Sequence, residues 1–306
     1  MNKLFALGIF LGIFFGNLDA GAACGSLTLS NLANPTYSFN TSTTPSLNLT
    51  ATKSHGSCSY FYTISYGSST SYTNRKISQG SYTIPVNFYS DAAHSKVVRD
   101  LPDVTGNNDV ISGNLSGGSS SDTLTYYPVM GASATYNRFG LYSDTYTISL
   151  YEGTTSSSTF RNSKTVTFNY TMPKVIDLSL VASGGAFNIV DTSETLSFGT
   201  LVTGAARSFD IVLKYNAGYT VKLSSANQGH LKHATLADLV PYSISVNSVT
   251  ANLVGSNITP VSVVSGTGVS ASAGLSLPST VTIGSLGTAR AGNYSDVITV
   301  TVVSSE

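Results

Sequence analysis

The end of the chain repeats an earlier segment, and this repeat limits what the chain can fold into. Residues 292–296 read GNYSD and precede an alternating run, VITVTVV, at 297–303. Residues 140–144 read GLYSD and precede TYTISL at 145–150, so the two copies are 152 residues apart. Apolar side chains at every second position indicate a β-strand with one buried face. The repeat therefore predicts two related β-domains of about 150 residues each.

The two copies differ in their downstream sequence. After the first copy the chain continues to a further alternating run, TVTFNY, at 165–170, whereas the sequence ends soon after the second copy. We expect the first domain to cover its own last edge, and the second to leave Ile298, Val300 and Val302 facing a groove. An open edge of this kind aggregates unless another strand covers it, and donation of a strand by another chain is one solution. The sequence predicts that the second domain accepts such a strand.

The composition favours strands and turns over helices. Only 10% of the 306 residues are charged and the formal net charge is zero, so no charge pattern indicates nucleic acid as a partner. Tyr, Gly, Ser and Thr are frequent. We predict an all-β chain of two immunoglobulin-like antiparallel sandwiches at 24–171 and 172–306, the second lacking its last strand. Pro173 suits the link between them, and short runs at 187–189 and 196–198 predict further strands in the second domain.

The first 23 residues have the pattern of a secretory signal peptide. Lys3 precedes an apolar segment at 4–15, and the small residues AGAA at 20–23 suit cleavage next to Cys24. A lipoprotein signal, with Cys24 as the modified residue, is the alternative. The chain has two cysteines, and in an exported protein Cys24 and Cys58 are expected to form a disulfide. Cleavage next to Cys24 would leave no free amino-terminal arm to donate to another subunit.

No arrangement of residues indicates catalysis. His230 and His233 lack the neighbouring Glu and the helix that a zinc pair of this spacing requires, and no G-x-S-x-G motif is present. We therefore predict no enzyme activity, no metal site and no cofactor. The repeated G-x-Y-S-D unit has a structural interpretation. Its Gly permits a positive φ, its Tyr hydroxyl can anchor a corner, and its Asp can hold the backbone of a turn.

Five short motifs resemble the spore coat protein U domain family, the subunits of archaic chaperone–usher pili. They are CSY at 58–60, YTIPVNFYSDA at 82–92, both copies of the repeat with their strands, and LSFGT at 196–200. The second domain departs from the family pattern because it has no cysteine pair. The resemblance implies pilin folds, assembly by a periplasmic chaperone and an outer-membrane usher, and a role in adhesion and biofilm formation. Two such domains without a donor arm resemble the tip adhesin.

The function predicted from these features is surface attachment at the tip of a pilus, after export through the periplasm to the cell surface. The first domain would bind an abiotic or host surface, and the second would be anchored by the donor strand of the next subunit. Two loop segments contain apolar residues that could contact a surface, and these are the predicted contact loops. They contain Val97, Val98, Leu101 and Pro102, and Tyr127, Pro128, Val129 and Met130. Loops folded back onto the core, and a structural spore-coat or pilus-shaft protein without an adhesive role, are the alternatives.

Overall fold

The structure, a computed structural model, describes residues 24–38, 46–131 and 136–305; the predicted signal peptide at 1–23 lies outside them. The regular structure of the described residues consists of strands and three short 3-10 turns, η1 (Tyr72–Asn74), η2 (Leu101–Asp103) and η3 (Asn107–Asp109). The predicted all-β class is therefore confirmed. Among these residues no helix has the length and apolar character needed to cross a membrane.

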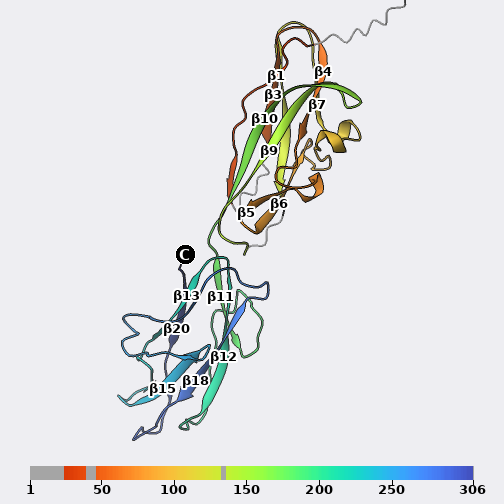
Figure 1. The fold of residues 1–306 in the computed structure, drawn as a ribbon. Coiled ribbons are helices and arrows are strands. Elements are labelled where there is room, and N and C mark those ends of the chain that lie inside the picture. The colour runs from red at the N-terminus through yellow and green to blue at the C-terminus, as the bar shows by residue number, and fades with distance from the viewer. Residues whose placement is uncertain (1–23, 39–45, 132–135, 306) are drawn as a thin grey trace, which may run out of the picture.

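The first domain is a curled sheet around one hydrophobic core (Figure 1). The strand order is β1-β3-β8-β6-β5-β9-β10-β2, with β4 beside β9 and β7 beside β4. All pairs are antiparallel except β2 with β10, which run parallel. The strands are β1 (Thr28–Leu29), β2 (Thr36–Ser38), β3 (Leu47–Lys53), β4 (Cys58–Ile64), β5 (Lys76–Gln79), β6 (Tyr82–Tyr89), β7 (Ile111–Leu115), β8 (Ser120–Met130), β9 (Gly140–Thr154) and β10 (Ser157–Met172).

The second domain is a sandwich of two sheets around its own core (Figure 1). The larger sheet has the order β11-β12-β18-β15-β14-β19 with β16 beside β15, and the smaller has the order β17-β13-β20. The strands are β11 (Ile176–Ala182), β12 (Ala206–Tyr215), β13 (Tyr219–Ser225), β14 (His230–His233), β15 (Leu239–Val246), β16 (Val249–Thr250), β17 (Val261–Gly266), β18 (Leu275–Ile283), β19 (Tyr294–Ser295) and β20 (Ile298–Ser304).

The alternating runs of the repeat become buried strand faces, as expected. In β9 the side chains of Tyr146, Ile148 and Leu150 are fully buried. The run at 165–170 lies in β10, which pairs with β9 along most of its length and so covers that edge. The predicted strands at 187–189 and 196–198 are wrong, because both segments lie in an irregular stretch between β11 and β12.

The repeated G-x-Y-S-D unit builds the same corner in both domains. The hydroxyl of Tyr142 donates to the carbonyl of Arg138 at 2.7 Å, and that of Tyr294 donates to the carbonyl of Arg290 at 2.7 Å. Gly140 has a φ of 121°, and a Cβ at Gly292 would overlap the His233 ring, so each position requires glycine. The predicted tyrosine corner, a feature of immunoglobulin-like sandwiches, is confirmed in both domains.

The aspartate of the unit also has the predicted role. Asp144 accepts hydrogen bonds from the backbone N–H and the hydroxyl of Ser68, both at 2.9 Å. Asp296 accepts from the backbone N–H of Asn227 at 3.0 Å and from the hydroxyl of Ser225 at 2.5 Å. Each carboxylate therefore holds a neighbouring turn or strand end against the start of the repeated strand.

Candidate functional site

The order of the strands shows what the second domain lacks. Sheet β17-β13-β20 repeats the order β7-β4-β9 of the first domain, and β19 pairs with β14 as the start of β9 pairs with β5. In the first domain the other edge of β9 carries β10. In the described part of the second domain β20 pairs only with β13. No strand of the described residues therefore occupies the position equivalent to β10.

A groove lies along this open edge of β20. We call it the acceptor groove; its volume is ≈ 1270 Å³, and it is bounded by two rims and a floor. One rim is the irregular segment at 192–201, and the other is the segment at 291–300, which includes β19 and the start of β20. The floor is mainly apolar, and its side chains are Leu178, Leu180, Phe209, Leu231, Val240, Tyr242 and Val281. The groove could accommodate an extended segment with apolar side chains.

The irregular rim explains why a predicted strand is missing. Leu196 and Phe198 alternate with exposed neighbours and rest half-buried against the core, as a strand would. In the described chain, however, the backbone of residues 193–201 makes no hydrogen bond to another backbone group. In the first domain β2 pairs in parallel with β10. The rim takes the place of β2 in chain order, and the described residues hold no equivalent of β10 for it to pair with. Apart from the carbonyl of Ser197, which accepts from Nε of Arg207, the backbone groups of residues 193–201 have no hydrogen bond to a described backbone partner or to Arg207.

The predicted acceptor edge lies beside this groove. Ile298, Val300 and Val302 of β20 pack against the second core, and all three are only half-buried. Their counterparts in β9, 152 residues earlier, are each 0% exposed. The difference follows from the missing neighbour, because a strand without a partner on one side leaves part of its inward face accessible.

A polar cluster closes one part of the groove. The hydroxyls of Tyr242 and Ser225 both donate to Oδ2 of Asp296 at 2.5 Å. Burial, followed by the hydrogen bond to Asp296, raises the pKa of Tyr242, so its hydroxyl stays protonated and donates. These contacts leave the polar atoms of the floor paired within the domain, so the groove favours an apolar occupant.

The second rim is tied to the turn between β14 and β15 by an ion pair. Arg290 donates from Nε and Nη2 to the two carboxylate oxygens of Asp238, at 2.8 and 2.7 Å. Asp238 lies in the turn between β14 and β15, and its hydrogen bond with Arg290 lowers its pKa to about 2. Tyr294 then binds the carbonyl of Arg290, so the rim is anchored before it reaches β20. Neither Arg290 nor the rim at 192–201 was among the predicted site residues.

The predicted contact loops are less exposed than the sequence indicates. Residues 127–130 are not a loop but the end of β8, where Tyr127 to Met130 pair with Tyr89 to Val86 of β6. Val98 is 0% exposed and Pro128 is also buried, so these two side chains cannot touch a surface. Val97, Leu101, Tyr127, Val129 and Met130 are half-buried, and Pro102 is exposed.

The position of the predicted contact residues within the first domain also bears on whether they can reach a surface. Figure 1 shows β6 at the end of the first domain that faces the second domain. The residues at 127–130 pair with β6, so they lie toward that end and not at the far end of the molecule. Val98 is buried because its backbone N–H donates to Phe88 of β6, which draws the segment against the core.

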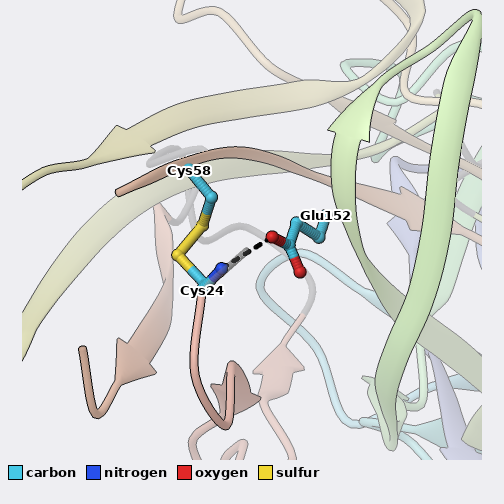
Figure 2. Close-up of side chains that lie close together, drawn as sticks. All are labelled: Cys24, Cys58 and Glu152. Carbon is cyan, nitrogen blue, oxygen red and sulfur yellow. Dashed lines mark hydrogen bonds between the residues drawn. A yellow bond between two sulfur atoms is a disulfide. The ribbon is translucent and has the colours of Figure 1, made fainter. Parts of the chain in front are cut away.

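The predicted disulfide is confirmed. Cys24 and Cys58 are bonded, with Cα atoms 5.5 Å apart. With Glu152 they form the one group of metal-ligand side chains within the described residues, but the disulfide occupies both sulfur atoms (Figure 2). A lipid-modified Cys24 is incompatible with this bond. His230 and His233 both lie in β14, and neither belongs to such a group.

Comparison with known families finds one match. Residues 15–149 match the model of the Spore Coat Protein U domain, so the resemblance predicted from short motifs is confirmed for the first half of the chain. This match does not extend to the second domain, for which a spore coat protein U-like fold remains a prediction. A comparison with curated proteins found no significant match.

Solved structures with a similar fold include subunits of bacterial fimbriae. A chaperone–tip subunit pre-assembly complex of archaic Csu pili from Acinetobacter baumannii is 14% identical, with 90% of this chain and 99% of that chain covered and a TM-score of 0.43. The CupB6 tip adhesin of Pseudomonas aeruginosa is 11% identical, with coverages of 92% and 96% and a TM-score of 0.40. CfaE, the adhesive subunit of CFA/I fimbria of enterotoxigenic Escherichia coli, is 12% identical, with coverages of 92% and 82% and a TM-score of 0.36. At these sequence identities and TM-scores the similarities carry no functional argument, so the function must be argued from the site itself.

Proposed function

We propose that the chain is the tip adhesin of a chaperone–usher pilus, anchored in its fibre by a strand that a neighbouring subunit donates to the acceptor groove. The observation that carries the proposal is the vacant strand position between β20 and the rim at 192–201. The groove is lined by apolar side chains, and the described rim backbone at 193–201 makes no hydrogen bond to other backbone, which are the two features that strand addition uses. The disulfide is consistent with passage through an oxidising compartment such as the periplasm.

The first domain indicates what the donated strand looks like. β10 runs antiparallel to β9 and buries alternate side chains, Val166, Phe168, Tyr170 and Met172. By the 152-residue offset, these four would face the positions of Ile298, Asp296, Tyr294 and Gly292. The donor would therefore be an extended segment with apolar residues at every second position, antiparallel to β20. Before assembly a periplasmic chaperone would cover the same groove, and an outer-membrane usher would exchange it for the donor.

The groove can be tested by giving the chain its own last strand. Position 304 corresponds to 152, so a copy of residues 153–172 placed directly after Ser304 would continue β20 as β9 continues into β10. We expect this full-length variant to fold without a chaperone. A free peptide of residues 164–172 should bind the parent chain and fail to bind the variant. Fluorescence anisotropy of the labelled peptide measures both.

The matched control is the same extension with asparagine at the copies of Val166 and Phe168. It has the same length and linker but cannot bury those side chains, so it should neither fold unaided nor block the peptide. Equal peptide binding by the parent and the extended variant would show that the groove is not a strand acceptor.

Attachment by the first domain is the second part of the proposal, and it would promote biofilm formation on an abiotic or host surface. Val97, Leu101 and Pro102 are the predicted contact residues of the first segment that remain at least partly accessible. Replacing all three with serine should reduce attachment of piliated cells while fibre length and number stay unchanged in electron micrographs. Val98→Ser is unsuitable, because that side chain is in the core and the substitution would destabilise the domain.

The alternative is a structural pilus or spore-coat subunit without an adhesive role. It is favoured by the burial of Val98 and Pro128 and by the placement of residues 127–130 in a strand. Immunogold labelling separates the two functions, since a tip adhesin labels only fibre ends and a shaft subunit labels the whole length. Labelling along the shaft, together with unchanged attachment of the triple serine variant, would support the alternative.

A further inference from the structure

We propose that Glu152 is the binding site for the α-ammonium group that Cys24 acquires when the chain is cut between Ala23 and Cys24. The backbone nitrogen of Cys24 lies 2.7 Å from Oε1 of Glu152, and Figure 2 shows the carboxylate pointing at that atom. Cys24 is only 3% exposed and the contact is partly buried. The ligand is the chain's own processed end, a primary ammonium.

The carboxylate is held in a setting that favours cations. Glu152 lies near the end of β9 and its side chain is 11% exposed, so leaving its charge unpaired there would be costly. Its second oxygen, Oε2, accepts from Nε of Arg161 at 2.6 Å and is ion-paired with Nη2 of the same residue. Arg161 is the extra residue of a β-bulge in β10, between Phe160 and Asn162, and a bulge re-aims a side chain. Oε2 of Glu152 thus binds Arg161, and Oε1 binds the backbone nitrogen of Cys24.

The position of residue 24 does not depend on Glu152. The disulfide ties Cys24 to Cys58 at the start of β4, and Glu152 of β9 pairs with Tyr60 of the same strand. Gly25 is also bonded on both sides, donating to the carbonyl of His55 at 3.0 Å and accepting from the N–H of Ser54 at 2.9 Å. Residue 24 is therefore pinned to the site by neighbours that would remain if Glu152 were replaced.

Hydrolysis of the bond before Cys24 changes the chemistry of this contact. Water adds across the amide, Ala23 leaves as a carboxylate, and the nitrogen of Cys24 becomes an ammonium at neutral pH. A hydrogen bond from an uncharged amide to the carboxylate then becomes an ion pair, in which the attraction between two opposite charges is added to the hydrogen bond. A cut one residue earlier would move the charge about 3.8 Å along the chain and leave an amide at the site. The domain would thus be most stable when the chain is cut at one bond only.

A double-mutant cycle tests whether Glu152 binds the ammonium of Cys24. It uses the full chain, purified in complex with its periplasmic chaperone. The four forms are the parent, a form with one glycine inserted between Ala23 and Cys24, Glu152→Gln, and the combination. Intact mass must first show Cys24, or the inserted glycine, at the amino terminus. We expect the glycine to lower the melting temperature of the first domain by about 3–6 °C in the parent and by less than 1 °C in Glu152→Gln. Near-ultraviolet circular dichroism reports this domain, because 14 of the 18 tyrosines precede residue 172.

The outcomes separate the proposal from a structural role for Glu152. An equal loss of melting temperature on glycine insertion in the parent and in Glu152→Gln would show that Glu152 accepts an ordinary amide hydrogen bond, and it would overturn the proposal. An amino terminus other than Cys24 in the parent would also overturn it. If Glu152→Gln fails to fold, reaction of the parent's α-amine with acetic anhydride provides a second test. It should be at least tenfold slower than in the glycine-inserted form, and equal rates would again overturn the proposal.

Discussion

Strand β9 begins with one copy of the G-x-Y-S-D unit and strand β20 follows the other copy, and both strands carry the same alternation. Among the described residues, however, β9 has neighbouring strands on both edges and β20 has one on a single edge. β9 has β10 along one side and β4 along the other, and its Tyr146, Ile148 and Leu150 are fully buried. β20 has β13 alone among the described strands, and its Ile298, Val300 and Val302 are half-buried. Burial of a strand therefore depends on its neighbours as much as on its own sequence.

The comparison extends to the opposite rim. In the first domain three residues, Thr36–Ser38, form β2 because β10 supplies hydrogen-bond partners. In the second domain the segment at 193–201 has suitable apolar residues but no partner strand, and it stays irregular. One absent strand thus leaves β20 with an open edge on one side of the position it would occupy and leaves the rim on the other side irregular.

The largest expected effect concerns the strand that only the first domain has. Phe168→Ala in β10 removes a ring that packs on Phe88 and Tyr146 and is 0% exposed. It should destabilise the first domain by about 3–5 kcal/mol, because the cavity forms in the centre of an aromatic cluster. Urea unfolding followed by tyrosine fluorescence measures this. A loss below about 1 kcal/mol would mean that β10 is not an integral part of this core.

The next prediction sets the two repeated strands directly against each other. Ile148→Ala in β9 should cost about 2–5 kcal/mol, whereas Val300→Ala in β20 should cost about 1 kcal/mol or less, because Val300 is only half-buried. In the variant with its own last strand, Val300→Ala should become clearly more costly. Unfolding curves of all three proteins provide the measurement, and an unchanged cost at Val300 would contradict the view that β20 awaits a neighbour.

A smaller effect is expected at the shared tyrosine corner. Tyr142→Phe and Tyr294→Phe each remove a hydroxyl that donates at 2.7 Å to a carbonyl four residues earlier. The loss should be about 1–1.5 kcal/mol at the fully buried Tyr142 and about 0.5 kcal/mol at the half-buried Tyr294, since water can replace the second bond. Thermal denaturation of the two variants tests the ranking, and a larger loss at Tyr294 would reverse it.

The smallest expected effect is a pH dependence confined to the second domain. The hydrogen bond with Arg290 lowers the pKa of Asp238 to about 2, below the usual 3.8 of an aspartate. The folded state therefore gains stability above about pH 4 and loses that gain as the pH falls toward 2. Asp238→Asn should flatten this part of the stability profile, measured by acid unfolding, and leave the first domain unchanged. Because the pair is exposed, the effect should be slight and should shrink further in high salt.

Period-two alternation and one repeat were sufficient to predict the fold class, the tyrosine corner and the open edge at Ile298, Val300 and Val302. These features depend on local chemistry or on comparison within the chain. The strand predicted at 196–198 was wrong because pairing is a tertiary property, and Leu196 and Phe198 lack a partner. Residues 127–130 look like a loop because they contain Pro128 and precede Gly131, yet Pro128 occupies a strand position opposite Phe88. Glu152 could not be singled out, because its partners come from Cys24 and from a bulge in β10.

The hairpin from β9 to β10 has a kinetic consequence. A strand joined to its partner by a two-residue turn is present at a high effective concentration, so the first domain completes its sheet in a first-order step that is independent of dilution. If the second domain takes its last strand from another molecule, its completion is second-order and slows as the donor becomes scarce. One domain would then mature on a fixed timescale, while the other would report how much partner is available.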